Sequence, residues 1–363
     1  MTVIEQAHAA HGAAFTDRGG RRVVAEYGRP ERTHRAVRNG VGVVELGYGV
    51  ITVSGEDRVA YVDNAVSNRV PDADGEGCYA LLCDPQGGIT TDMYVYNAGE
   101  RLLVFLPPDR AGPVAEEWAS KTFIQDVTVE AATDDVAVFG VHGPRATEKI
   151  ASVLHGASAP EGALSFVRGS MGEAGVTVVV GDGLAGEDSY TVVCDADVAD
   201  EAFDTLLNRG MNAVPFGYTV WETLTLEAGT PLFHTELEGR IPNVAGVRNA
   251  LDFEKGCYVG QEVVSRVENQ GRPSRRLVGL VVDGPMPEAG AAVFDGDASV
   301  GEVTRAAVGP SREATLALAY VRFDADAEDV TVRVDGAEVP ARREPLPFVE
   351  GSARSARLPS YPS

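Results

Sequence analysis

Apolar residues along this chain fall mostly into short runs separated by glycine, proline and aspartate. Runs rich in β-branched and aromatic residues predict strands at 40–53, 78–84, 89–97 and 101–107. Apolar residues spaced every three or four positions predict helices at 58–65 and 113–120. A turn at Pro85–Gly88 lies between the second and third of these strands, so we expect them to form a hairpin.

The same pattern returns in the next part of the chain. Strands are predicted at 127–143 and 175–183, and helices at 144–154 and 198–208. Strand runs interrupted by single helices favour an α+β fold, with tandem antiparallel α+β subdomains, over a doubly wound parallel sheet. Neither of the glycine-rich loops typical of dinucleotide and P-loop nucleotide binding is present in the sequence.

The pattern changes after about residue 270, where short strands are separated by Gly, Pro and Asp turns. This pattern predicts a small antiparallel β-barrel or sandwich. From Gly351 the chain is rich in serine and proline without periodicity, which is typical of a disordered tail. We therefore divide the chain into an α+β body at 1–268, a C-terminal β-barrel at 269–350 and a disordered tail at 351–363.

The charge of the chain narrows its possible environment and partners. Asp and Glu number 54 against 31 Lys and Arg, so the formal net charge is −23. The lysines are Lys121, Lys149 and Lys255. An acidic, lysine-poor surface stays hydrated in concentrated salt, so we interpret it as halophilic, with an acidic partner-binding surface as the alternative. Nucleic-acid binding is disfavoured because it needs a cationic surface.

The sequence also indicates where the protein works. No apolar run approaches the roughly 18–20 residues that span a bilayer, and the first residues lack the pattern of a secretory signal. The four cysteines are too few for a disulfide framework in a chain of this length. We therefore expect a protein of the reducing cytoplasm that does not bind membranes.

Two carboxylates stand in glycine-rich surroundings. Asp92 follows the glycine turn and lies in a β-branched, aromatic strand, where an unpaired charge is costly to bury, so it either faces water or belongs to a site. Glu187 lies in a loop at 181–190. A carboxylate there can pair with the N–H and amine on one edge of a pterin ring. The alternative for Glu187 is a solvated acidic turn.

Three further features have both structural and functional interpretations. Glu227 lies near the end of a predicted helix, where the helix dipole disfavours an anion, so it needs a hydrogen-bonding or ligand partner. In the segment Lys255–Glu262, Cys257 is either a reactive thiol beside Lys255 or an inert core residue. A cationic cluster can either grip the carboxylates of a glutamate tail or join the body to the barrel by ion pairs; it consists of Arg266, Arg272, Arg275 and Arg276.

Taken in order, several segments resemble the aminomethyltransferase (glycine cleavage T-protein) and YgfZ superfamily. The similar segments cover roughly residues 30–350, and they are Ser67–Val70, Gly87–Asp92, Phe139–Pro144, Gly183–Tyr190, Leu226–Gly229, Val300–Thr304 and Pro345–Phe348. The resemblance implies a body that binds tetrahydrofolate and a C-terminal barrel. It also implies candidate catalytic residues Asp92 and Cys257, and candidate folate-binding residues Tyr79, Asp92, Glu187, Tyr190, Glu227, Lys255 and Arg266.

Within the superfamily, Lys-Gly-Cys-Tyr-Val-Gly-Gln-Glu at 255–262 is similar to the signature of the YgfZ-type branch. That branch uses folate to support assembly or repair of iron–sulfur enzymes. Two departures from the transferases point the same way: Thr91 replaces the first of two aspartates that assist the transfer, and Thr225 replaces an arginine. The leading hypothesis is therefore a tetrahydrofolate-binding, YgfZ-like protein with iron–sulfur client proteins.

Three alternatives stay open on the sequence. The first is an aminomethyltransferase that moves a one-carbon unit from a lipoyl carrier protein to tetrahydrofolate. The second is a folate-dependent demethylase, and the third is a scaffold with an empty pocket.

Overall fold

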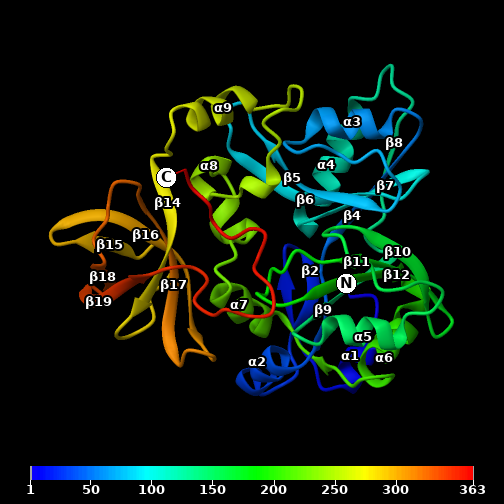
Figure 1. Cartoon of the computed structure of the whole chain (residues 1–363), viewed down its shortest axis with the longest axis horizontal. Helices are drawn as coiled ribbons and strands as arrows, with labels where there is room; N and C mark the ends of the chain where they lie inside the picture. The colour runs from blue at the N-terminus through cyan, green and yellow to red at the C-terminus, as the bar shows by residue number, and fades with distance from the viewer. Residues whose placement is uncertain (1, 363) are drawn as a thin grey trace.

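The hairpin predicted around Pro85–Gly88 is present, and it forms one edge of a five-stranded sheet. The computed structural model describes residues 2–362, which form three lobes, each built on its own sheet (Figure 1). In the first lobe the strand order is β5 (Glu76–Cys83), β6 (Ile89–Asn97), β7 (Arg101–Leu106), β4 (Gly49–Ser54) and β8 (Thr128–Ala131), all antiparallel. Helices α3 (Arg58–Ala65) and α4 (Pro108–Ser120) pack on one face through a shared apolar core.

The second lobe contains a six-stranded sheet. Its order is β10 (Phe166–Met171), β11 (Ala174–Val180), β12 (Ser189–Asp195), β9 (Val136–His142), β3 (Gly42–Glu45) and β13 (Val214–Pro215), with β13 parallel to β3 and the other pairs antiparallel. One face packs against α1 (Glu5–Ala10), α5 (Ala146–Val153) and α6 (Ala199–Asn208), the last of which follows a short 3-10 turn at Ala196–Val198. The opposite face turns toward the first sheet.

An apolar core between the two sheets joins the first two lobes. Buried side chains from both sheets share this core, with Tyr94, Tyr96 and Phe105 from the first sheet and Val138 and Val179 from the second. A hairpin of β1 (Ala14–Arg18) and β2 (Arg21–Glu26) and helices α2 (Pro30–Asn39) and α7 (Tyr218–Glu227) lie beside this core.

The third lobe is a closed barrel, as predicted. Its six strands are ordered β14 (Arg275–Val282), β17 (Ala314–Arg322), β16 (Ala298–Gly309), β15 (Ala292–Asp295), β18 (Asp329–Val334) and β19 (Ala337–Glu344). Alternate residues along these strands fill the interior with valine and alanine. Four short elements connect α7 to the barrel: a π-helical turn at Phe233–Leu237, α8 (Pro242–Ala245), a 3-10 turn at Arg248–Ala250 and α9 (Gln261–Asn269). The predicted α+β fold with a C-terminal barrel is confirmed.

The C-terminal segment, defined as residues 351–362, is ordered in the structure, whereas the sequence predicted a disordered tail. It has no helix or strand, but it crosses from the barrel to the middle of the molecule and returns to the barrel (Figure 1). Hydrogen bonds hold it at both ends: the hydroxyl of Ser352 donates to Glu187, and the N–H of Ser360 donates to the carbonyl of Gly246. Serine and proline exclude regular structure, but they do not exclude order that comes from tertiary contacts.

Candidate active site

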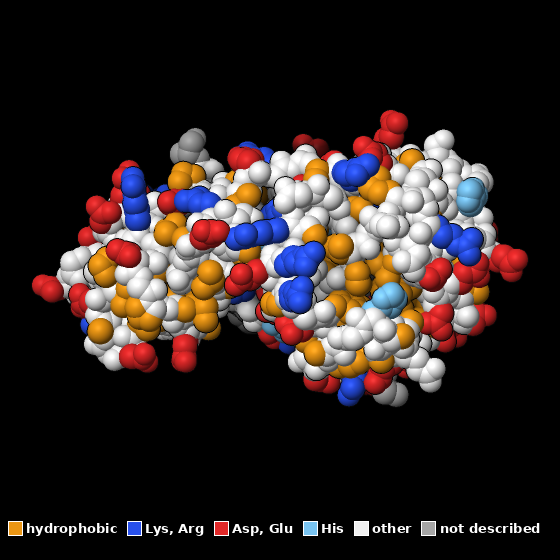
Figure 2. All heavy atoms as spheres, turned by 90° about the horizontal axis from the view of Figure 1, so that it is seen from below, with side chains coloured by type: hydrophobic (Ala, Val, Ile, Leu, Met, Phe, Trp, Pro, Cys, Tyr) orange, Lys and Arg blue, Asp and Glu red, His pale blue; other side chains and the backbone are white. Residues whose placement is uncertain are grey.

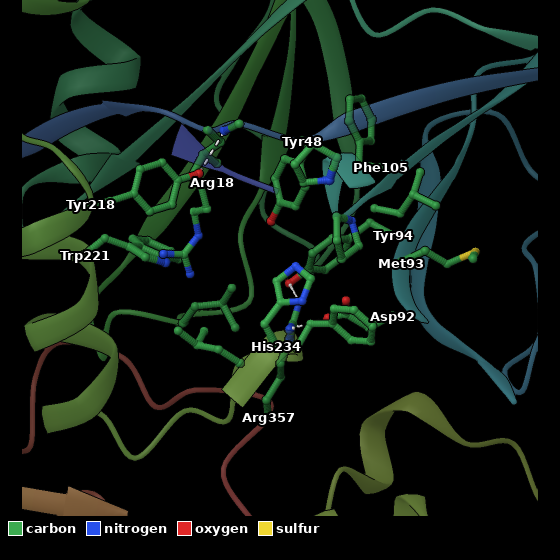
Figure 3. Close-up of a pocket in the computed structure, with 18 residues that line it drawn as sticks. Arg18, Tyr48, Asp92, Met93, Tyr94, Phe105, Tyr218, Trp221, His234 and Arg357 are labelled. Atoms are coloured by element: carbon green, nitrogen blue, oxygen red, sulfur yellow. Dashed lines mark hydrogen bonds and ion pairs between the residues drawn. The ribbon is translucent and has the colours of Figure 1, made fainter. Parts of the chain in front are cut away.

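A cavity opens where the first sheet, α7 and the C-terminal segment meet. It holds about 700 Å³ of space free of protein atoms, a volume that includes open solvent at its mouth. Its walls are mainly aromatic and apolar. Figure 3 shows Tyr218 and Trp221 from α7 on one side and Tyr94 and Phe105 from the first sheet on the other. Such walls favour a flat, ring-containing ligand.

Asp92 lines this cavity from β6. The residue is 6% exposed, and its Oδ2 accepts hydrogen bonds from the Tyr79 hydroxyl at 3.0 Å and from Nη1 of Arg357 at 2.8 Å. Both hydrogen bonds that the carboxylate accepts within residues 2–362 go to Oδ2. Oδ1 is therefore the oxygen available to a ligand.

Because side chains alternate along β6, only one of positions 91 and 92 can face the cavity. Successive side chains of a strand point to opposite faces of its sheet. Tyr94 belongs to the core between the sheets, whereas Met93 belongs to the core under the helices. Thr91 shares the face of Met93 and is buried there, and Asp92 shares the face of Tyr94. A second aspartate at position 91 would therefore point away from the cavity.

Arg357 of the C-terminal segment fills the space beside Asp92. Besides its contact with Asp92, its Nη2 donates to the Tyr94 hydroxyl at 2.6 Å, and its guanidinium lies 3.9 Å from the centre of the Tyr79 ring. The Tyr94 hydroxyl donates in turn to Oδ2 of Asp182 at 2.6 Å. The result is a buried chain of charged and phenolic groups at one end of the cavity.

Burial controls the ionisation of these groups. It raises the pKa of Tyr48, Tyr79 and Tyr94, so the three phenols stay neutral and can donate hydrogen bonds. Burial also raises the pKa of Asp182, although the positive charge of Arg357 opposes this effect. The site thus combines neutral donors with carboxylates that lie next to a fixed cation.

His142 occupies the inner end of the same region. Its ring is buried beside Trp221, and neither ring nitrogen has a hydrogen-bonding partner within residues 2–362. Burial lowers the pKa of His142 to about 3, so the imidazole is neutral near pH 7. A neutral imidazole offers one donor and one acceptor. It lines a small inner space next to Tyr48 and Asp182.

Cationic and titratable side chains stand at the rim. Arg18 lies over the Tyr218 ring and pairs with Glu222, and His234 lies 3.2 Å from Asp109. Both Arg18 and His234 line the cavity and remain partly exposed. Neither was among the residues predicted from the sequence, because an arginine or histidine beside a turn has no distinctive pattern.

Two predicted folate ligands already have protein partners. The carboxylate of Glu187 is buried, and it accepts hydrogen bonds from Arg38 and from the backbone and hydroxyl of Ser352. Glu227 is fully buried, and it accepts hydrogen bonds from Arg38, His34 and Ser311. Neither lines the cavity. The network confirms the prediction that Glu227 has a specific partner, and its partners are other residues of this chain.

Four other predicted residues also lie outside the cavity lining. Tyr190 is in the core on the other side of the second sheet, with its hydroxyl 3.1 Å from that of Thr147. The Lys255 ammonium is buried among backbone carbonyls, whereas Cys257 and Arg266 are exposed at the surface. Tyr79, by contrast, reaches the site through its hydrogen bond to Asp92. The segment 255–262 is therefore spatially separate from the aromatic cavity lining.

Arg357 is a further site residue that the sequence did not indicate. It lies in the segment predicted to be disordered, and its approach to Asp92 spans most of the chain. The ring of Trp221 is buried and also forms a wall of the cavity. A cavity wall and a packed core have the same hydrophobic pattern, so the sequence could not distinguish them.

Comparison with known proteins agrees with this architecture. Residues 4–255 match the family model described as GCVT N-terminal domain, and residues 275–350 match the glycine cleavage T-protein C-terminal barrel domain. The aminomethyltransferase of Streptomyces avermitilis is 31% identical over 362 residues, covering 96% of each chain. The aminomethyltransferase of Geobacillus kaustophilus is 29% identical, covering 96% of this chain and 98% of its own.

A solved structure shares the whole fold. The crystal structure of glycine cleavage system aminomethyltransferase T from Bartonella henselae superimposes with a TM-score of 0.85 at 23% sequence identity. The match covers 97% of this chain and 98% of that chain. The order of the lobes and the closed barrel are therefore those of a known fold.

These matches correct the leading hypothesis from the sequence. The prediction of a YgfZ-like protein that supports iron–sulfur enzymes is wrong, because the curated relatives named above are aminomethyltransferases. Thr91 misled the sequence interpretation, since its side chain lies on the face of β6 away from the cavity. The superfamily itself was predicted correctly. With both family models matched and relatives of 31% identity over nearly its full length, the chain belongs to the aminomethyltransferase (glycine cleavage T-protein) family.

Proposed function

We propose that this protein is an aminomethyltransferase that passes a one-carbon unit from an aminomethyl-lipoyl carrier protein to tetrahydrofolate. Family membership supports this reaction class, because aminomethyltransferases of the glycine cleavage system use tetrahydrofolate. The single observation that carries the proposal is Asp92, a buried carboxylate with one free oxygen in a cavity whose walls are mainly aromatic and apolar. We propose that the folate ring lies among these aromatic walls.

The reaction requires a group that can accept a proton from a folate nitrogen. The carbon–sulfur bond to the lipoyl arm and the carbon–nitrogen bond to the leaving amine break, while two bonds form from the carbon to folate nitrogens N5 and N10. The two hydrogens lost from these nitrogens end on ammonia and on the lipoyl thiol. In our proposal Oδ1 of Asp92 accepts a hydrogen bond from a reacting folate amine and helps to move its proton toward the departing ammonia.

The position of Thr91 removes the main argument against transferase activity. The sequence suggested that an aspartate missing at position 91 would weaken the transfer. In the fold, Thr91 is buried away from the cavity, and its hydroxyl donates to the carbonyl of Asp92. Asp92 alone is therefore placed to act on a ligand, as it would be in a chain with two aspartates.

The test is production of methylenetetrahydrofolate from a loaded aminomethyl-lipoyl carrier protein, measured for the wild type and two variants. Asp92→Asn keeps the shape of the side chain but removes the proton acceptor, so we expect kcat to fall about 100-fold or more. Thr91→Ser is the matched control on the same strand and should leave kcat unchanged. Equal activity of wild type and Asp92→Asn would contradict the role of Asp92.

We also propose that the protein works in a cytoplasm of high ionic strength. The acidic excess of the sequence supports this environment. The four cysteines, of which three are buried, are all free thiols, which suits a reducing compartment. Among residues 2–362, no helix is long and apolar enough to cross a membrane.

A further inference from the structure

Arg357 brings a positive charge to the candidate catalytic carboxylate from the far end of the chain. Its side chain is 5% exposed, and it lines the aromatic cavity. Nη1 contacts Asp92 at 2.8 Å, and Nε lies 3.8 Å from Oδ2 of Asp182. The guanidinium therefore stands between two buried carboxylates, one on β6 of the first lobe and one in the loop between β11 and β12 of the second lobe.

This arrangement reduces the electrostatic cost of burying two carboxylates close together. Two carboxylates in an apolar, aromatic space repel each other, and each is costly to keep ionised away from water. One guanidinium lies near both carboxylates and reduces their repulsion, and its planar set of donors fixes the orientation of the groups that it binds. Because it holds Oδ2 of Asp92, the rotation of that carboxylate is set and Oδ1 is presented to the cavity.

Arg357 is itself held from both sides along the chain. Before it, the Ser352 hydroxyl donates to Glu187; next to it, the Ala356 N–H donates to the carbonyl of Asp182. After it, the Tyr361 hydroxyl donates to the carbonyl of Val244. The flat face of the guanidinium also lies against Tyr79. The segment thus fixes the guanidinium in space rather than leaving it on a free end.

We propose that Arg357 is a positioning residue that orients Asp92 and supplies a countercharge beside it, and that the active site is incomplete without the C-terminal segment. The inference rests on the proposed function, since it assigns a partner to the carboxylate that acts in the transfer. It goes further by making residues 351–362 part of the catalytic unit. A segment that only covered the barrel would have no need of a buried cation at its centre.

The test compares Arg357→Ala with Arg354→Gln in the transfer assay. Arg354 lies in the same segment, is exposed and pairs with Glu350, so it is a matched control. Loss of one oriented charge at a reacting group commonly costs about 100-fold or more in kcat. We expect a loss of that order for Arg357→Ala, with a smaller change in KM, and wild-type kcat for Arg354→Gln.

Chemical rescue separates positioning from packing. The alanine variant leaves a guanidinium-sized space, so added guanidinium chloride at non-denaturing concentration should restore part of kcat, whereas sodium chloride at the same ionic strength should not. Arg357→Lys should keep part of the activity, because lysine supplies the charge without the second donor. Thermal melting of every variant shows whether it is folded.

Three results would overturn the inference. The first is a folded Arg357→Ala variant with wild-type kcat, and the second is an equal effect of guanidinium and sodium. The third is a loss of kcat that follows only the unfolded fraction. In each case an active wild type would leave the proposed function standing. A wild type without transfer activity, by contrast, would reject the proposed function and this inference with it.

Discussion

Of the three lysines in this chain, Lys149 and Lys255 each have an ammonium surrounded by backbone carbonyls, whereas Lys121 is exposed. The Lys255 ammonium lies at the end of α3, where it donates to the carbonyls of Asp63 at 2.5 Å, Val66 at 2.9 Å and Asn68 at 2.9 Å. Lys149 donates in the same way to three carbonyls, that of Thr205 in α6 and those of Arg209 and Met211 after it. A planar guanidinium cannot point its donors into such a cage. The lysine of the 255–262 signature therefore has a structural task.

Replacement of Lys255 by arginine should destabilise the protein. The larger, planar group leaves buried carbonyls unsatisfied, and each buried polar group without a partner costs about 1–3 kcal/mol. We expect a loss of about 2–4 kcal/mol in the free energy of unfolding, measured by denaturant titration in high salt. Lys121→Arg is the control, because the Lys121 side chain is 60% exposed. Equal stability of the two variants would show that the cage is not what retains Lys255.

Sequence reasoning at single residues worked where the signal was local. Asp92 was singled out as a carboxylate in an apolar strand, and the structure places it in the cavity. Glu187 was singled out by its loop, but its carboxylate is occupied by Arg38 and Ser352, which lie far away in the sequence. Its pterin-binding role remains a prediction. Residue type and local spacing do not reveal a partner brought in by tertiary folding.

At the scale of elements, one buried network joins α2, α7 and the barrel. Glu227 at the end of α7 accepts hydrogen bonds from His34 and Arg38 of α2 and from Ser311, in the turn between β16 and β17. Burial by itself would raise the pKa of Glu227, but its contacts with His34 and Ser311 lower the pKa to about 2. The network therefore links the barrel to the body by a charge that favours the folded state.

This network predicts a specific dependence of stability on pH. The folded-state pKa of Glu227 lies below its ordinary value of 4.5, so its stabilisation is complete above that value and is lost as the pH falls toward about 2. Glu227→Gln should lower the free energy of unfolding by about 3 kcal/mol near pH 7. The difference from wild type should shrink as the pH falls through this window.

Urea unfolding at a series of pH values in high salt would measure the effect. Glu313→Gln is the matched control, because Glu313 joins α2 to the same turn through Arg35 but is mostly exposed. Exposed pairs contribute about 0–1 kcal/mol, so this variant should remain close to wild type. A Glu227→Gln deficit that stays constant from neutral to acid pH would mean that packing, not ionisation, is responsible.

Elements were predictable where hydrophobic period and turn residues coincide. The helix predicted at 58–65 is α3, and the predicted hairpin is β5 and β6. The barrel was predicted without its strand order, which depends on pairings between distant segments. The C-terminal segment was missed because its order comes from contacts with loops of the body. Local propensity depends on residues that are neighbours along the chain, so it does not include such contacts.

The whole molecule carries a strong negative charge that its ion pairs do not remove. Figure 2 shows acidic side chains spread over the outer edges of one face and a group of basic side chains nearer its centre. The net charge of −23 makes the compact state repel itself at low ionic strength, although many arginines pair with nearby carboxylates. The fold should therefore depend on screening by dissolved ions.

Stability should accordingly rise with salt. The screening length falls from about 10 Å at 0.1 M to about 3 Å at 1 M ionic strength, which removes most repulsion between exposed charges. We expect Tm to increase by several degrees as KCl rises over this range. At low salt, unfolding relieves charge repulsion because it spreads the charges apart, and screening by KCl removes this advantage of the unfolded state. Sucrose at equal osmolality is the control that separates screening from water exclusion. A Tm that is flat in KCl, or that rises equally in sucrose, would mean that charge repulsion does not limit stability, and the halophilic interpretation of the acidic composition would then fail.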